Sequence, residues 1–137
     1  MKRTGLLIHC SKQELAEMRR RARGEHRQIS SYALSVVMPV VAFEEGLRKQ
    51  YQGLGDLFLQ LARRPPAQPR TTMLLRCSVA EARRIRAAAS RRRVTLSGYV
   101  LFALHRRWAV VAARRELLAT ASNRRASPKP TAEPSPQ

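Results

Sequence analysis

Arginine and lysine dominate the side chains of this sequence that could bind a ligand. They number 27 against 9 aspartates and glutamates, which gives a formal net charge of +18 at pH 7. The densest arginine runs fall at residues 19–23 and 91–93. A charge of this size makes a lone globule repel itself, and a polyanion would relieve that repulsion. A nucleic acid or an anionic membrane surface would meet this requirement.

Side chains that catalyse reactions or hold metals are few and scattered. The three histidines, His9, His26 and His105, fall in different predicted elements, and none has a carboxylate or cysteine at ligand spacing. The sequence also lacks a glycine-rich phosphate-binding loop. We therefore expect a protein that is not an enzyme and that has no catalytic residue, no metal and no cofactor.

The apolar segments are too short to span a bilayer. The longest, residues 32–43, has 12 residues, whereas a transmembrane helix needs about 18 or more. The start of the sequence lacks the hydrophobic region and cleavage site of a signal peptide. Two cysteines, Cys10 and Cys77, fit buried thiols of a reducing compartment better than a disulfide scaffold. We expect no membrane partner and a cytoplasmic, nucleoid-associated location.

The sequence repeats itself at an offset of 67 residues. Residues 3–34 align with residues 70–101 without a gap, and 11 of these 32 positions are identical. Two copies are too few for a solenoid, which needs at least three. The two copies are therefore expected to pack on each other about a pseudo-twofold axis.

Each copy begins with a predicted strand followed by a capped helix. Apolar residues alternate along the strands, and those of the face expected to be buried are Leu6, Ile8, Cys10, Met73, Leu75 and Cys77. Each strand ends in a Ser-x-x-Glu capping box, Ser11 with Glu14 and Ser78 with Glu81. A helix with one apolar stripe and an arginine-rich opposite face follows both times.

A second helix is predicted after a short break in each copy. Ile29 and Leu96 precede Ser30 and Ser97, which are expected to be the N-caps. The apolar residues of these helices, which extend to Phe43 and Leu118, cover more than one stripe, as is typical of buried helices.

The pattern predicts a first copy over residues 1–50, a linker over 51–69, a second copy over 70–118 and a disordered tail over 119–137. A two-stranded ribbon is marginal unless helices cover one face, so the two copies should fold as one unit. The expected fold is mainly α, a two-stranded antiparallel ribbon plus four helices. With the dyad near Leu7 and Leu74, Cys10 and Cys77 would lie about 20 Å apart and could not form a disulfide within the chain.

The order strand, capped helix, turn and capped helix resembles the ribbon-helix-helix family of DNA-binding proteins of the Arc and MetJ type. The second copy is most similar, through Leu74-Leu-Arg-Cys-Ser78, Glu81, Ile85-Arg-Ala-Ala-Ala89 and Val94-Thr-Leu-Ser-Gly-Tyr-Val-Leu101. Two copies in one chain resemble the fused, TraY-like tandem members. The resemblance covers residues 3–43 and 70–112.

The resemblance implies that the outward face of the ribbon contacts bases in the major groove. The implied base-contacting residues are Gly5, Leu7, His9, Thr72, Leu74 and Arg76. Arg76 is the best candidate, because a guanidinium can pair with two acceptors of guanine. Leu7 and Leu74 stand where the family usually has polar side chains, so they offer apolar contact, for example to thymine methyls, unless protein covers them.

The resemblance also implies phosphate contacts at the strand starts and at the N-termini of the second helices. The implied residues are Lys2, Arg3, Ser30, Ser31, Arg70, Ser97 and Gly98.

The function that follows from the resemblance is sequence-specific binding of double-stranded DNA, with side-by-side self-association on DNA. The protein would act as a transcriptional repressor or as a relaxosome accessory factor in plasmid mobilisation. One alternative is an antitoxin that binds its own promoter and a toxin partner through the tail. Another is a non-specific nucleic-acid or protein interaction module.

Overall fold

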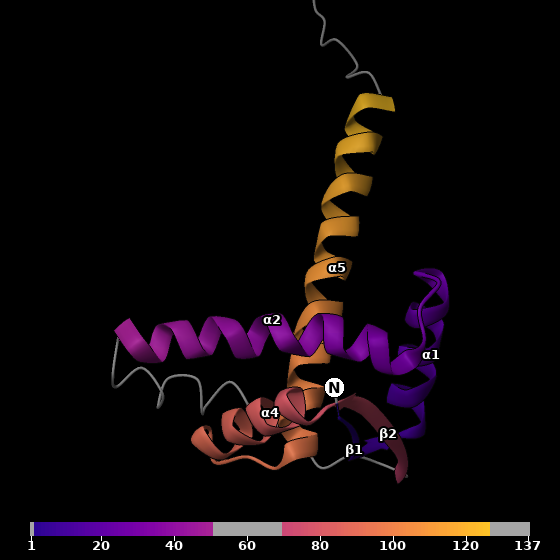
Figure 1. The fold of residues 1–137 in the computed structure, drawn as a ribbon. Coiled ribbons are helices and arrows are strands. Elements are labelled where there is room, and N and C mark those ends of the chain that lie inside the picture. The colour runs from indigo at the N-terminus through magenta and orange to yellow at the C-terminus, as the bar shows by residue number, and fades with distance from the viewer. Residues whose placement is uncertain (1, 51–69, 127–137) are drawn as a thin grey trace, which may run out of the picture. The chain divides into compact units, whose positions relative to one another are not determined.

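The computed structural model describes residues 2–50 and 70–126 of the 137-residue chain. The first copy contains β1 (Arg3–Ser11), α1 (Lys12–Gly24) and α2 (Ile29–Gln50), and the second contains β2 (Arg70–Ser78), α4 (Val79–Arg91) and α5 (Leu96–Ala126). The described residues thus form a mainly helical β-α-α-β-α-α fold with one two-stranded ribbon and four helices (Figure 1), which confirms the predicted fold class. The predicted linker, 51–69, lies outside the described residues, as does the stretch 127–137 of the predicted tail.

The chain divides into two units after His105. The first unit, Met1–His105, contains both strands, α1, α2, α4 and the start of α5, and the second, Arg106–Gln137, contains the remainder of α5. Helix α5 continues to Ala126, so the disorder predicted from residue 119 is wrong for residues 119–126. Alanines and arginines in this stretch favour a helix, and the first proline that follows is Pro128.

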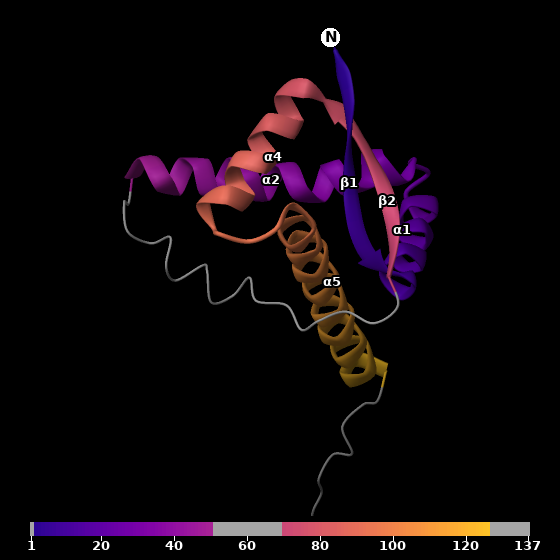
Figure 2. The same ribbon diagram turned by 90° about the horizontal axis from the view of Figure 1, so that it is seen from below.

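The two strands pair antiparallel with Leu7 opposite Leu74, the predicted register. Figure 2 shows β1 and β2 side by side. The six side chains predicted for the inner face, Leu6, Ile8, Cys10, Met73, Leu75 and Cys77, are all buried. Both cysteines are free thiols, and the register places them at opposite ends of the ribbon. The inner face of the ribbon is therefore the floor of a core that both copies share.

Both capping boxes form as predicted. The Ser11 hydroxyl accepts the Glu14 amide N–H at 3.0 Å, and the Glu14 carboxylate accepts the Ser11 amide N–H at 2.8 Å. The corresponding distances for Ser78 and Glu81 are 3.1 and 2.9 Å. These bonds satisfy amides that a helix start leaves unpaired, and they fix the turn from each strand into its helix.

The break after each first helix is a left-handed turn at a non-glycine residue. His26 has a φ of 55° and Arg93, its counterpart in the second copy, has a φ of 56°. In the first copy the next amide, that of Arg27, donates to the carbonyl of Ala22 at 2.8 Å, which closes the helix end as in a Schellman motif. This turn ends each first helix and leads into the second helix of the same copy.

The second helices supply most of the remaining core, although less of each is buried than predicted. Tyr32, Val37 and Val41 of α2 and residues 99–101 and Leu104 of α5 are buried. Phe43 and Leu118, by contrast, are exposed. Phe43 lies in the second half of α2, and Leu118 lies in the part of α5 that belongs to the second unit. Apolar side chains are common on protein surfaces, so apolar character alone does not show that a residue is buried. No helix within 2–50 and 70–126 combines the length and the hydropathy that a membrane span requires.

Candidate nucleic-acid interface

The outer face of the ribbon carries all the predicted base-contacting residues. Because side chains of a strand alternate between its faces, the residues between the buried ones point to the opposite side. The exposed residues on that side are Gly5, Leu7, His9, Thr72, Leu74 and Arg76. Leu7 is 52% and Leu74 is 50% exposed, so the described residues do not cover this face.

The register makes the two ends of this outer face chemically different. Arg76 lies opposite Gly5, a residue without a side chain. At the other end His9 lies opposite Thr72. The centre is the apolar pair of Leu7 and Leu74. A ligand bound along this face would therefore meet a cation at one end and smaller polar groups at the other.

Ser30 and Ser97 hold the second helices against the outer edges of the ribbon. The Ser30 hydroxyl accepts the Arg76 amide N–H at 2.9 Å and donates to the Leu74 carbonyl at 3.3 Å. The Ser97 hydroxyl accepts the His9 amide N–H at 2.7 Å. Each serine thus bonds the strand of the other copy. The prediction that these serines are N-caps is wrong, because α2 begins at Ile29 and α5 at Leu96, so that each serine is already inside its helix. The serines instead bond strand amides, which need a partner at the open edge of a ribbon.

Thr95 caps α5 in place of Ser97. Its hydroxyl accepts the amide N–H of Gly98 at 3.0 Å. The Gly98 amide, predicted to bind a phosphate, is therefore already bonded within the chain. Ser31, in the first turn of α2, is exposed. The cap could have been found from the sequence, since threonine is a favoured N-cap residue and stands three residues before Gly98.

The predicted phosphate-contacting cations lie at the strand starts. Lys2 and Arg3 are exposed, and the Lys2 carbonyl accepts the amide N–H of Val79 at 3.1 Å. This bond fixes the start of β1 beside the end of β2. Arg70 begins β2, opposite Ser11 at the other end of the ribbon. The structure thus places cationic residues at both ends of the ribbon.

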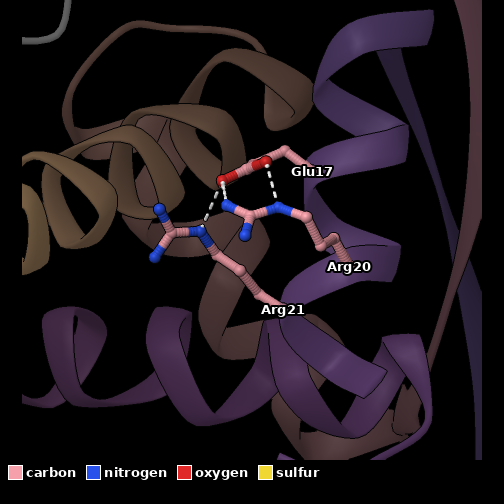
Figure 3. A network of polar contacts seen from close by, with 3 residues as sticks. All are labelled: Glu17, Arg20 and Arg21. Atoms are coloured by element: carbon pink, nitrogen blue, oxygen red, sulfur yellow. Dashed lines mark hydrogen bonds and ion pairs between the residues drawn. The ribbon is translucent and has the colours of Figure 1, made fainter. Parts of the chain in front are cut away.

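Two arginines of the α1 run are bound by a carboxylate of the same helix (Figure 3). Both Arg20, at 2.6 Å, and Arg21, at 2.7 Å, contact Oε1 of Glu17. These hydrogen bonds, that from Arg20 foremost, lower the pKa of Glu17 from 4.5 to about 2. Part of the positive charge of α1 is therefore neutralised locally and is less available to a polyanion.

Replacing Glu17 with glutamine should flatten the dependence of stability on acid pH. A depressed carboxyl pKa stabilises the fold above the unfolded value of 4.5, and this contribution is lost as the pH falls through about 2. The loss above pH 4.5 should be only about 0.5 kcal/mol, because the Arg20 side chain, which contributes most to the shift, is 63% exposed and solvent screens its contact with Glu17. Urea unfolding between pH 6 and pH 2 measures it. Glu25→Gln is the control, since the Glu25 carboxylate lies 3.6 Å from Arg27, and an equal effect there would contradict the assignment.

A buried polar cluster joins the two copies, and the sequence pattern did not predict it. Arg92, next to the end of α4, forms an ion pair with Glu44 of α2, and the Tyr99 hydroxyl of α5 donates to the same carboxylate at 2.8 Å. The Arg92 guanidinium also lies 4.7 Å from the Phe102 ring centroid. Burial raises the pKa of Tyr99 well above its usual value. This cluster fixes the end of α4 and the start of α5 against α2.

A second missed contact joins α5 to the first capping box. The His105 ring lies 2.5 Å from the Glu14 carboxylate, which already accepts the Ser11 amide. In the repeat, Glu81 is the counterpart of Glu14 and Met38 is the counterpart of His105, so the second copy lacks the histidine for the same contact. The polar contacts of the two copies therefore differ, although their backbones repeat.

No protein-family model, no curated protein and no solved structure matches this chain. The resemblance to the ribbon-helix-helix family therefore depends on the residues and on the fold described above.

Proposed function

We propose that this protein binds double-stranded DNA sequence-specifically by inserting the β1–β2 ribbon into the major groove. The observation that carries the proposal is the division of the ribbon into a fully buried inner face and an outer face that solvent reaches. The outer face presents Arg76, His9 and Thr72, whose side chains can hydrogen-bond base edges. A two-stranded ribbon has the width that the major groove admits.

The charge and the helix positions support the same function. Lys2 adjoins the ribbon and Arg3 begins it, and the net charge of +18 favours a polyanion. Ser30 and Ser97 bring the starts of α2 and α5 to the ribbon edges, where helix N-termini can approach phosphates. Together with the family resemblance, this arrangement supports a role as a transcriptional repressor or a relaxosome accessory factor.

Replacing Arg76 with alanine should weaken binding to a preferred duplex by about 1–3 kcal/mol and relax specificity at one position. The preferred duplex is obtained by selection from random double-stranded DNA with the full chain. His9→Ala should relax specificity in the other half of the site, because the two residues lie toward opposite ends of the outer face. Fluorescence anisotropy on the selected duplex and on single-position variants measures both effects.

Arg83→Ala is the matched control, because Arg83 is an exposed arginine of α4 outside the ribbon. It should leave the base preferences unchanged. The proposal fails if selection yields no preferred duplex, or if Arg76→Ala and His9→Ala leave both affinity and preference as they are in the parent protein.

A further inference from the structure

The centre of the outer face is an apolar pair within a cationic surface. The Leu74 carbonyl and the Arg76 amide are both bonded by Ser30, so they point away from β1. Residues of β2 with this orientation belong to non-hydrogen-bonded pairs, in which the facing Cα atoms are about 4.5 Å apart and the side chains adjoin. Leu7 and Leu74 therefore form one continuous apolar contact surface, half of it in solvent.

Gly5 determines how Leu74 lies. A Cβ atom at Gly5 would be 2.7 Å from Cδ1 of Leu74 and 3.2 Å from its Cγ. The Leu74 side chain thus occupies the space that a side chain at position 5 would take. The counterpart of Gly5 in the second copy is Thr72, which has a side chain beside Leu7. The Leu74 side chain can therefore extend along the outer face toward Arg76, and the pair of Leu7 and Leu74 is asymmetric.

From this geometry we infer that Leu7 and Leu74 bind the C5-methyl groups of pyrimidines at the centre of the DNA site, with Gly5 as the positioning residue for Leu74. The inference rests on the proposed function. Among the base edges of the major groove, the apolar group is the thymine methyl, and 5-methylcytosine carries the same methyl at the same ring position. The cations beside the pair favour DNA as the occupant over another copy of this chain, which shares its charge of +18.

The expected effect follows from the size of the methyl group. Burying one methylene-sized group against an apolar surface strengthens binding about fourfold at 25 °C. Removing one contacted methyl should therefore raise the Kd by about fourfold, and the effect should be confined to the central positions of the site.

The test replaces thymine with deoxyuridine, one position at a time, in the duplex selected with the full chain. This substitution removes the methyl and leaves every hydrogen-bonding group in place. A second arm places a C·G pair at the same central positions and compares cytosine with 5-methylcytosine there. If only the exchange between uracil and thymine changes the affinity, thymine is the base that is bound. If methylation raises the affinity equally in both arms, the methyl group itself is bound, whichever base carries it. Both results support the inference.

Two variants separate the contact from the fold. Leu7→Ala with Leu74→Ala should bring the thymine-to-uracil affinity ratio close to one. Gly5→Ala should reduce the ratio while leaving the urea unfolding midpoint nearly unchanged, because the atom it displaces is the end of a flexible side chain. Val79→Ala is the control, an exposed apolar residue outside the ribbon, and should keep the full ratio.

The inference is overturned if a preferred duplex exists but removing the methyl changes the Kd by less than about twofold at every central position in both arms. It is also overturned if the double leucine variant keeps the parent ratio. The absence of any preferred duplex would instead remove the proposed function, and the inference with it.

Discussion

Replacing Arg92 with methionine should lower the free energy of unfolding by about 3–5 kcal/mol. The Arg92 side chain is 5% exposed and that of Glu44 is 11% exposed, so the ion pair between them is almost fully removed from water. Without the guanidinium, the Glu44 carboxylate would remain buried beside the Tyr99 hydroxyl and would have lost the charge that forms its ion pair. Urea unfolding followed by circular dichroism measures the loss.

The chain contains its own control for this prediction. Arg84 of α4 contacts Glu45 of α2 at 2.6 Å, but the side chains are 44% and 31% exposed. Arg84→Met should cost less than about 1 kcal/mol, because exposed ion pairs contribute little. Equal losses for the two variants would show that burial does not govern the Arg92 contact. Combining Arg92→Met with Glu44→Gln should restore part of the lost stability, since the double variant leaves no buried charge.

The sequence was sufficient to predict the features of the fold that depend on neighbouring residues. The partners in both capping boxes are three residues apart, so Ser11 and Ser78 could be assigned from spacing alone. The alternation of apolar residues identified the buried face of each strand, and the repeat supplied the pairing of the strands. The central position of Leu7 and Leu74 in the register followed from placing the two copies about a dyad.

Contacts between distant segments could not be predicted in the same way. The Ser30 hydroxyl bonds an amide 46 residues away, and the Ser97 hydroxyl bonds one 88 residues away. A serine near a helix start is typical of an N-cap, and nothing in its neighbourhood indicates a strand of the other copy. The same holds for Glu44 and Arg92, whose counterparts in the repeat are Val111 and Glu25. The repeat therefore predicts a symmetry that these polar contacts do not follow.

The sequence predicted which residues share the outer face of the ribbon, but not how their side chains pack on it. Period-two alternation was enough to group Arg76, His9 and the two leucines. The close approach of Leu74 to Gly5 depends on a diagonal neighbour across the ribbon, which only the register and the side-chain geometry specify. Because of that contact, Gly5 contributes to the difference between the two ends of the outer face.

Raising the salt concentration from about 50 to about 200 mM should weaken duplex binding by about 10²–10³-fold if about five phosphates are neutralised. Lys2, Arg3 and Arg70 supply three of the proposed contacts, and the starts of α2 and α5 supply one each. The logarithm of the binding constant should fall linearly with the logarithm of salt, with a slope of about −0.9 for each phosphate. Anisotropy titrations at four or five salt concentrations measure the slope.

The position of the cations, and not their number alone, should set this slope. Lys2→Gln with Arg3→Gln should make it shallower by about 2, because both side chains are exposed beside the ribbon. Arg20→Gln with Arg21→Gln removes the same formal charge, but these guanidiniums are bound to Glu17 on α1. This second pair should leave the slope nearly unchanged. Equal changes for both pairs would mean that affinity follows total charge, and the phosphate contacts proposed at the ribbon would be wrong.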